Sequence, residues 1–206
     1  MRITSNAKAA TRQRILDAAT TLFKTEGWHN ATTRDIAAAA GIATGTVFNY
    51  FPTKESIAAA LISEALQHSG EEFPIGQLQE CSLEAGLFTL IWSGLSKLRE
   101  YRSFLAPAIE SIFSPLARPP AARAGDAIRI DHLEKVAAII TSNGFPGPPS
   151  AVTVQLYWTL YLGVFAFWAA DESPGQEDTL ALLDQSLKLF VSSLGMNQGR
   201  GTNGRQ

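Results

Sequence analysis

The chain has 206 residues, of which 46% are hydrophobic and 17% are charged, so it can bury a core larger than that of a minimal domain. Its single cysteine, Cys81, excludes an internal disulfide framework and any metal site that needs several cysteines. Residues 1–55 hold seven basic and four acidic residues, whereas the rest of the chain holds ten and fifteen. This contrast, hidden in a net charge of −2, indicates that the first part faces a polyanion. The N-terminal residues carry charges but no apolar run, so we expect no secretory signal.

Four helices are predicted at the start of the chain from apolar spacing and from the residues between the apolar runs. Their expected ranges are 11–26, 34–40, 44–50 and 54–69. Threonines stand at three expected N-caps, and they are Thr33, Thr44 and Thr53. The expected breakers between the helices are Gly27, Gly41 and Pro52. The first three helices form a head whose core is expected to hold Ile15, Ala19, Leu22, Phe23, Ile36, Ala37, Val47 and Phe51.

Residues 70–76 are rich in glycine, glutamate and proline, and we place the boundary between the head and a body there. Beyond it, helical patterns cover 78–101, 102–113, 121–142, 150–170 and 176–194. No segment alternates with the period of a strand over a useful length, so the fold is predicted to be all-α, with about nine helices. The tail 195–206 has no apolar residue after Met196 and is expected to be disordered.

One segment, Ala151–Ala170, contains no charge over 20 residues and is long enough to span a bilayer. Its polar threonines and glutamine and its central aromatic residues favour a helix that protein buries on all sides. Acidic residues rather than a basic cluster follow it, which also argues against a span. We therefore expect no membrane partner, with a membrane-associated protein kept as an alternative.

The head is either a small structural three-helix bundle or a helix-turn-helix whose second helix enters the major groove of DNA. Three details favour DNA. The 34–40 segment is almost all alanine, which lets a neighbouring helix approach closely. The next helix begins with small groups, Thr44, Gly45 and Thr46, which permit approach to a phosphate or a base edge. Tyr50 and Lys54 follow on the same side and are able to contact phosphates.

The stretch "TRQRILDAATTLFKTEGWHNATTRDIAAAAGIATGTVFNYFPTKESI" resembles the DNA-binding head of the TetR family of bacterial transcriptional regulators. The resemblance covers about residues 8–57 as a DNA-binding domain, followed by a connecting helix at 53–69 and a body at 76–194. It implies a recognition helix at 44–50, in which Asn49 is the best base reader because its amide can pair with adenine. The residues that it places against DNA are Thr33, Arg34, Thr44, Gly45, Thr46, Asn49, Tyr50 and Lys54. Two positions depart from relatives, because Thr44 replaces a frequent Lys or Arg and Phe48 replaces a frequent Tyr.

The resemblance also implies a two-fold dimer through the last two long helices, on a palindromic operator. The residues expected at this interface are Tyr157, Gly163, Trp168, Leu180, Leu183, Leu187 and Phe190. The body carries more aromatic surface than five helices need, which leaves either core packing or an apolar effector pocket. The residues expected to line such a pocket are Phe88, Trp92, Phe104, Glu110, Phe113, Gln155, Trp158, Tyr161 and Phe165.

An enzyme is not expected, because the sequence shows no nucleophile motif, no phosphate-binding loop and no paired carboxylates. Its three histidines, His29, His68 and His132, lie far apart in the sequence, so no metal site, catalytic residue or cofactor is predicted. The sequence instead predicts a cytoplasmic, dimeric transcriptional repressor, released from double-stranded DNA by a small apolar or aromatic ligand. A DNA-binding regulator without any effector remains the alternative.

Overall fold

A computed structural model describes residues 5–67, 75–113, 121–145 and 147–200 of the chain. These residues form helices and connecting turns, with no β-strand among them, so the predicted all-α fold is confirmed. The contacts divide the chain into two compact units. The first unit comprises Met1–Gln67 and Leu98–Arg129, and the second comprises His68–Lys97 and Ile130–Gln206. The division therefore does not follow chain order, because the segment after residue 97 joins the head rather than the rest of the body.

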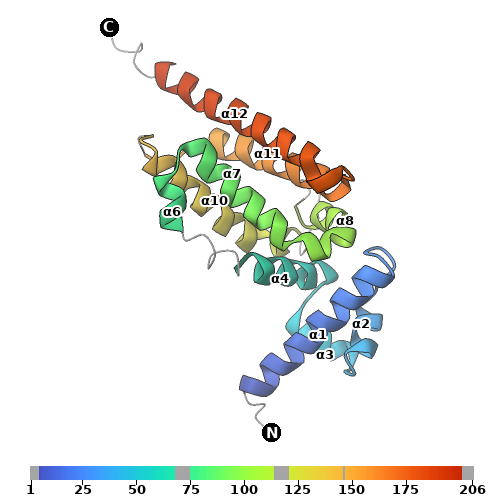
Figure 1. The fold of residues 1–206 in the computed structure, drawn as a ribbon. Helices are drawn as coiled ribbons and strands as arrows, with labels where there is room; N and C mark the ends of the chain where they lie inside the picture. Colours follow the sequence, from blue (N-terminus) through green and yellow to red (C-terminus); the bar gives the residue numbers. More distant parts are fainter. Residues whose placement is uncertain (1–4, 68–74, 114–120, 146, 201–206) are drawn as a thin grey trace. The chain divides into compact units, whose positions relative to one another are not determined.

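The first unit contains the head and four further elements (Figure 1). Its helices are α1 (Ser5–Thr25), α2 (Thr33–Ala39), α3 (Thr44–Tyr50), α4 (Lys54–Gln67), α8 (Arg102–Phe113) and α9 (Ala121–Ala124), with a 3₁₀ turn η1 (Arg99–Tyr101). The residues expected in the head core are buried, except Leu22, which is half-buried. The expected connecting helix is present as α4 up to Gln67, and the remainder of its predicted range lies outside the described residues.

The caps of the two short head helices differ from the prediction by one residue. Thr32, not Thr33, caps α2, because its hydroxyl accepts from the Asp35 amide while the Asp35 carboxylate accepts from the Thr32 amide at 3.1 Å. Only the earlier threonine has an acidic residue three positions on, as this reciprocal capping box requires. The α3 N-cap is Ala43 and makes no side-chain cap, so Thr44 is the first residue inside the helix.

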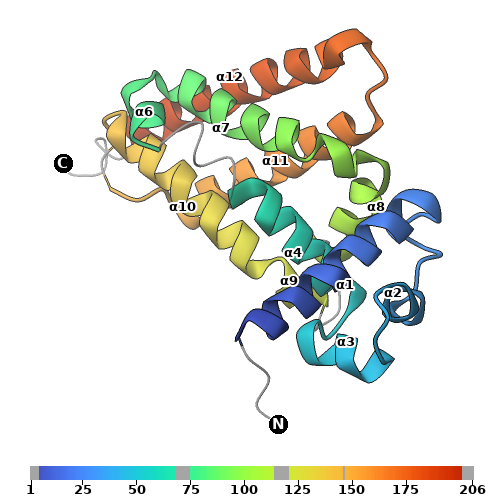
Figure 2. The same cartoon turned by 60° about the horizontal axis from the view of Figure 1, so that its bottom comes forward.

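The first unit is held together by contacts between α1 and the segment that includes α8. The Phe23 ring of α1 lies 5.1 Å from the Phe104 ring of α8, and both side chains are buried. At the same end of α1, Lys24 forms an ion pair with Glu100 and lies 5.4 Å above the Tyr101 ring. Figure 2 shows α1 running past α4 and α8. This helix of the head therefore also packs against the segment that contains α8.

The second unit is built from helices of the body. They are α6 (Ile75–Glu80), α7 (Leu83–Lys97), most of α10 (Asp126–Ser142), α11 (Ala151–Ala170) and α12 (Glu177–Arg200), with a 3₁₀ turn η2 (Pro174–Gln176). Two expected helices are each divided, at Cys81–Ser82 and at Gly125. At Gly125 a Cβ would lie 2.3 Å from the Phe113 ring, so a larger residue would not fit without movement. Part of the expected tail is helical, since α12 continues to Arg200, and 201–206 lie outside the described residues.

Helix α11 begins after Ser150, whose hydroxyl accepts from the Thr153 amide at 3.2 Å. The helix packs on α12 and α7, but within one chain it is not covered on every side. Val152 is 77% exposed and Phe167 is 43% exposed, whereas Trp168 is fully buried. By length and apolar composition α11 is able to cross a membrane, a test that the core helix of a soluble protein also passes. The expectation of complete burial therefore holds for one face only.

Candidate nucleic-acid interface

Helices α2 and α3 form a compact helix-turn-helix. Gly41 adopts a left-handed backbone with φ of 64°, which a residue with a Cβ rarely adopts. This turn lets the Ile42 amide donate to the Ala37 carbonyl at 3.0 Å and closes the end of α2. Ile36 and Ala37 of α2 and Val47 of α3 are buried, so the inner faces of the two helices are fixed by packing. The outer face of α3 is left open.

The sequence-predicted contact residues lie on α2, α3 and the start of α4. Arg34, Gly45 and Asn49 are exposed, and Arg34 forms no salt bridge with any residue that the structure describes. Thr33, Thr44, Thr46 and Tyr50 are half-buried. At Gly45 a Cβ would have no neighbour within 4 Å, so the backbone of α3 is open to a surface at this position. The arrangement offers small polar groups, an amide and a guanidinium on one unit.

Lys54 has a different environment from the other candidates. Its ammonium group donates to the carbonyl oxygens of Trp28 at 2.5 Å and of Ala31 at 3.1 Å. It also lies 4.5 Å from the centroid of the Trp28 ring. Loss of water around the half-buried side chain lowers the pKa of Lys54. Two of its three donors thus serve the turn after α1, a role that the sequence pattern did not indicate.

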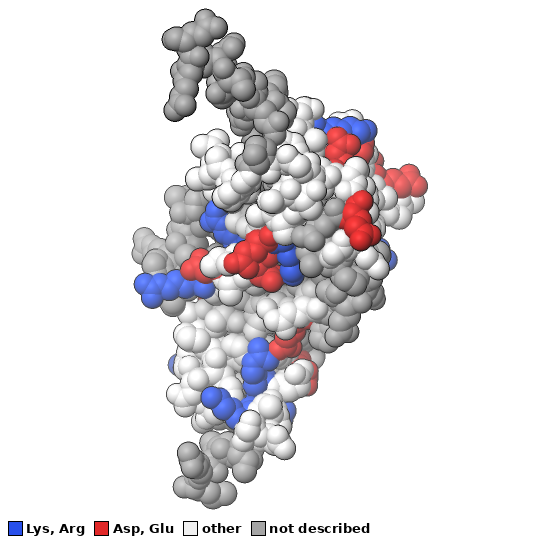
Figure 3. All heavy atoms as spheres, turned by 90° about the vertical axis from the view of Figure 1, so that its left-hand side faces the viewer, with Lys and Arg blue, Asp and Glu red and all other residues white. Residues whose placement is uncertain are grey.

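The basic residues of the first unit are unequal in their surroundings. Arg12 forms an ion pair with Glu64 and lies 5.5 Å from the centroid of the Phe51 ring. Lys8 lies on the exposed first turns of α1, in a stretch without acidic residues. Figure 3 shows one face of the protein, on which charged side chains lie as separate groups among uncharged surface. On the face shown, the basic side chains therefore form no single dense patch. Arg2 lies outside the described residues.

A cluster of aromatic side chains forms the core of the second unit. His132 of α10 shares a hydrogen bond of 2.9 Å with the Tyr157 hydroxyl of α11 and stacks on Tyr161 at 4.3 Å. Burial lowers the pKa of His132 to about 4 and raises the pKa of Tyr161 well above its ordinary value. At neutral pH the imidazole is therefore uncharged. Sequence reasoning missed this pair, because the spacing of 25 residues between its members carries no periodic signal.

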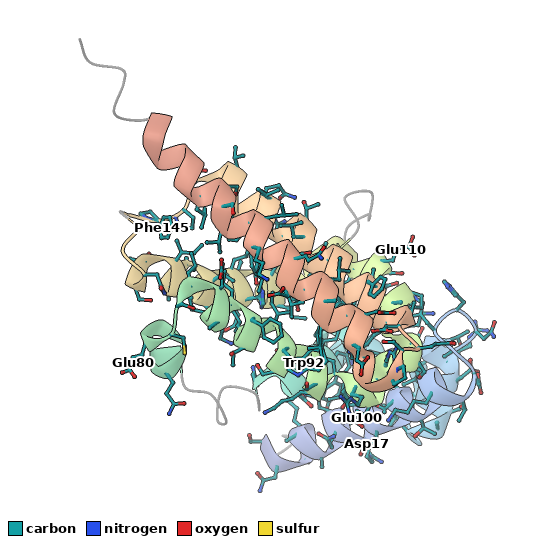
Figure 4. All side chains as sticks on the ribbon, turned by 45° about the horizontal axis from the view of Figure 1, so that its top comes forward. Asp17, Glu80, Trp92, Glu100, Glu110 and Phe145 are labelled. Carbon is teal, nitrogen blue, oxygen red and sulfur yellow. The ribbon has the colours of Figure 1, made fainter. Side chains whose placement is uncertain are left out.

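The residues expected in an effector pocket are divided between the two units. Phe104, Glu110 and Phe113 lie on α8 in the first unit, and Glu110 is exposed (Figure 4). Gln155 is also exposed. In the second unit, the His132 ring contacts the rings of Trp158 and Tyr161 on α11. The Phe165 ring packs against Tyr161.

Phe88 and Trp92 lie on α7 and are half-buried. Phe88 lines a groove of about 270 Å³ between α7 and α12, together with Leu187. Glu84, Asp184 and Lys188 form its charged rim, on which Lys188 and Asp184 pair at 2.7 Å. Among the described residues, no group of three or more His, Cys, Asp or Glu side chains is placed to hold a metal ion.

The residues expected at a dimer interface lie mostly inside a single chain. Those buried there are Tyr157, Trp168, Leu183, Leu187 and Phe190, whereas Leu180 is half-buried and Gly163 is exposed. Helix α11 is free of charged residues on both its buried and its exposed face, so periodicity alone could not tell its internal face from its outer one. The exposed residues on the outer face of α11 include Val152, Gln155, Leu156, Thr159, Gly163, Ala166, Phe167 and Ala170. Among the residues of α12 up to Leu194, the exposed apolar ones are Ala181 and Leu189.

A family model described as bacterial regulatory proteins, tetR family, matches residues 15–61. A second model, described as the tetracyclin repressor-like C-terminal domain, matches residues 87–200, more than half of the chain. The chain belongs to the TetR family. It is therefore a TetR-family transcriptional regulator, and family members are DNA-binding regulators rather than enzymes. This agrees with the family and the class of protein expected from the sequence.

Two curated relatives match parts of this TetR-family regulator. A stretch of 53 residues is 43% identical to the HTH-type transcriptional repressor KstR2 of Rhodococcus jostii and covers 26% of each chain. A stretch of 104 residues, 48% of this chain and 53% of the relative, is 33% identical to the uncharacterized HTH-type transcriptional regulator YvkB of Bacillus subtilis. The matches thus span about a quarter and about half of the lengths of these relatives.

The whole fold resembles that of solved TetR-family proteins. One of them is Thermus thermophilus FadR, a transcriptional repressor solved in complex with lauroyl-CoA, with a TM-score of 0.68 and 27% identity. The similarity covers 87% of this chain and 93% of that protein. It therefore includes the second family segment as well as the head.

Proposed function

We propose that this TetR-family regulator is a dimeric, cytoplasmic repressor that inserts α3 into the major groove of a palindromic operator. The observation that carries the proposal is the pairing of a packed inner face on α2 and α3 with an open outer face that holds Arg34, Gly45 and Asn49. In a helix-turn-helix, residues near the start of the second helix meet base edges and flanking groups bind phosphates. The Asn49 amide suits adenine, and Arg34 suits a phosphate.

The dimer is proposed to form through the outer faces of α11 and α12. An uncharged face along a whole helix is unusual at a protein–water boundary and marks an interaction surface. Small residues on it, such as Gly163 and Ala166, allow a second helix to approach closely. Two copies bring two α3 helices to half-sites about 34–36 Å apart. This face replaces the buried residues first expected at the interface.

The effector is proposed to be a small apolar or aromatic molecule bound in the body. The similarity to Thermus thermophilus FadR, solved with lauroyl-CoA, makes an acyl chain the first candidate for the apolar part. Residues after position 55 hold ten basic against fifteen acidic side chains. This balance disfavours the several negative charges of a CoA group, so an uncharged or weakly charged ligand is preferred. Binding that differs between the DNA-bound and free forms would shift operator affinity by linkage.

Selection of bound DNA from a random pool with the full-length protein tests the proposal, followed by titration of ligands into the protein–operator complex. We expect a palindromic site, and release by dodecanol or an aromatic ligand rather than by lauroyl-CoA. Asn49→Ala should relax preference at one base pair per half-site at a cost of about 1–3 kcal/mol. The exposed Gln77→Ala on α6 is the matched control and should bind as the wild type. Selection that yields no preferred sequence would refute the proposal, and release by no ligand would leave a regulator without an effector.

A further inference from the structure

Phe48 is an exposed aromatic residue on the recognition helix. Its side chain is 48% exposed, and it is alone among α1–α4 of the described chain in being a large hydrophobic residue with this degree of exposure. The other large hydrophobic side chains exposed in the described residues are Ile130, Val152, Leu156, Phe167 and Leu189, all outside the head. Nothing in the packing of the head requires an aromatic ring at this position.

The position of Phe48 on α3 places it beside the groups proposed to meet DNA. Val47, the preceding residue, is fully buried and defines the inner side of the helix. One residue later, Asn49 is exposed, so positions 48 and 49 share the outer side. Helical side chains lean towards the N-terminus, so the ring of Phe48 leans towards the preceding turn, which contains Thr44 and Gly45, without lying within 4 Å of a Cβ placed at Gly45. The open space above Gly45 leaves that turn without a competing side chain.

The chemistry of a phenyl ring limits the groups of DNA that Phe48 can contact. It has no donor for a phosphate oxygen and no group for the polar edges of the bases. In the major groove the only apolar group that a base pair presents is the 5-methyl group of thymine. We propose that Phe48 is a specificity-determining residue that packs against a thymine methyl group in each half-site. The inference rests on the proposed docking of α3 and adds which base feature the helix reads beside Asn49.

Deoxyuridine differs from thymidine only by the missing methyl group, so it isolates this contact. Each thymine of the selected operator is replaced singly by deoxyuridine, and binding of the full-length protein is measured by fluorescence anisotropy at fixed salt. We expect one thymine per half-site at which the replacement weakens wild-type binding about fourfold, the factor that follows from burying one methyl group. Phe48→Ala should bind the thymine and uracil operators equally. Phe48→Leu, which keeps an apolar contact, should retain part of the preference.

Thymines outside the half-sites provide the internal control, and their replacement should change nothing. Equal binding of all uracil operators by the wild type, on a site that is otherwise read specifically, would overturn the inference but leave the proposed function intact. The same loss at uracil in Phe48→Ala and in the wild type would also overturn it. A change in the number of protein copies per operator without any uracil effect would assign Phe48 to a protein contact instead. Selection without any preferred DNA would refute both proposals together.

Discussion

At the scale of single residues, Lys54 is a charged side chain of the first unit that is engaged within the chain. Lys54 carries the right charge and position for a phosphate, yet its ammonium group binds the Trp28 and Ala31 carbonyls. Both carbonyls belong to the turn that follows α1, where Gly27 has a left-handed backbone. The sequence does not indicate that the carbonyl oxygens of this turn need a hydrogen-bond donor. Through these hydrogen bonds Lys54 holds the start of α4 against the turn after α1. We therefore interpret its role as structural rather than as a direct contact with DNA.

Lys54→Met, which keeps the apolar stem, tests this role. Loss of two hydrogen bonds should reduce stability by about 1–2 kcal/mol and lower Tm by about 2–6 °C in a thermal melt. The slope of log affinity for the operator against log salt should stay unchanged, because no phosphate contact is lost. Arg34→Gln is the matched control, and it should lower that slope by about one without a change in Tm. A lower slope in Lys54→Met with an unchanged Tm would restore the phosphate contact first predicted.

At the scale of elements, helix positions were predictable and their faces were not. The bounds of α8 and α11 follow from apolar spacing, from Ser150 as a cap and from proline-rich breaks. The break at Gly125 was not predicted, and the missing Cβ there leaves room for the Phe113 ring, a contact between segments that the sequence does not show. The same limit explains α11, since an apolar residue such as Tyr157 suits a core and an interface equally well. Which face packs inward depends on the partner helix rather than on the helix itself.

The His132–Tyr157 contact joins α10 to α11 and makes their packing sensitive to acid. The pKa of His132 is about 4 in the folded chain, against an ordinary value of 6.5, because burial disfavours the charged imidazole. Above pH 6.5 both folded and unfolded chains hold a neutral His132, and its contribution to stability is constant. As pH falls from 6.5 to 4, only the unfolded chain takes up the proton, so stability decreases by about 1.4 kcal/mol per pH unit.

Denaturant unfolding at several pH values between 4 and 8 measures this dependence. The double variant His132→Phe/Tyr157→Phe removes both polar groups at once and should lose this part of the slope below pH 6.5. His29→Gln, which changes an exposed histidine, should keep the wild-type slope. Equal slopes in the wild type and the double variant would show that His132 is solvated rather than buried and neutral.

At the scale of the whole molecule, one chain supplies one α3 helix for the proposed docking on DNA and an uncharged outer face on α11. Leu156→Glu combined with Phe167→Glu places two charges on that face at positions already exposed in the single chain. We expect a monomer in sedimentation equilibrium, with Tm changed little beyond the loss of association. Operator affinity should fall at least about tenfold, because each chain then holds a single half-site.

Ile130→Glu serves as the control for the dimer test, since Ile130 is 57% exposed and lies off the α11 face. It should leave both mass and affinity unaltered. A dimer that persists with two glutamates on α11 would place the interface elsewhere.

Across the whole chain, the head was predictable in detail and the second unit only in outline. The head has a sequence pattern in which Ile36, Gly41 and Val47 have fixed structural tasks. In the second unit, by contrast, the sequence shows only that Phe88 and Trp158 are apolar. It does not show whether their side chains point into a core, a pocket or an interface. Phe104 is an example of this limit. It was expected to line the effector pocket of the body, whereas its ring packs on Phe23 in the first unit.

The packing of Phe104 on Phe23 has a consequence for protein engineering. One way to build a chimeric regulator from this chain would be to exchange its head for that of another protein, with a cut after α4. In this chain a cut after α4 would leave behind Phe104 and Glu100, and the ring of Phe23 would face water. The transplantable module is therefore discontinuous, and residues 98–129 must travel with residues 1–67. A head transferred as residues 1–67 alone would lack part of its own core.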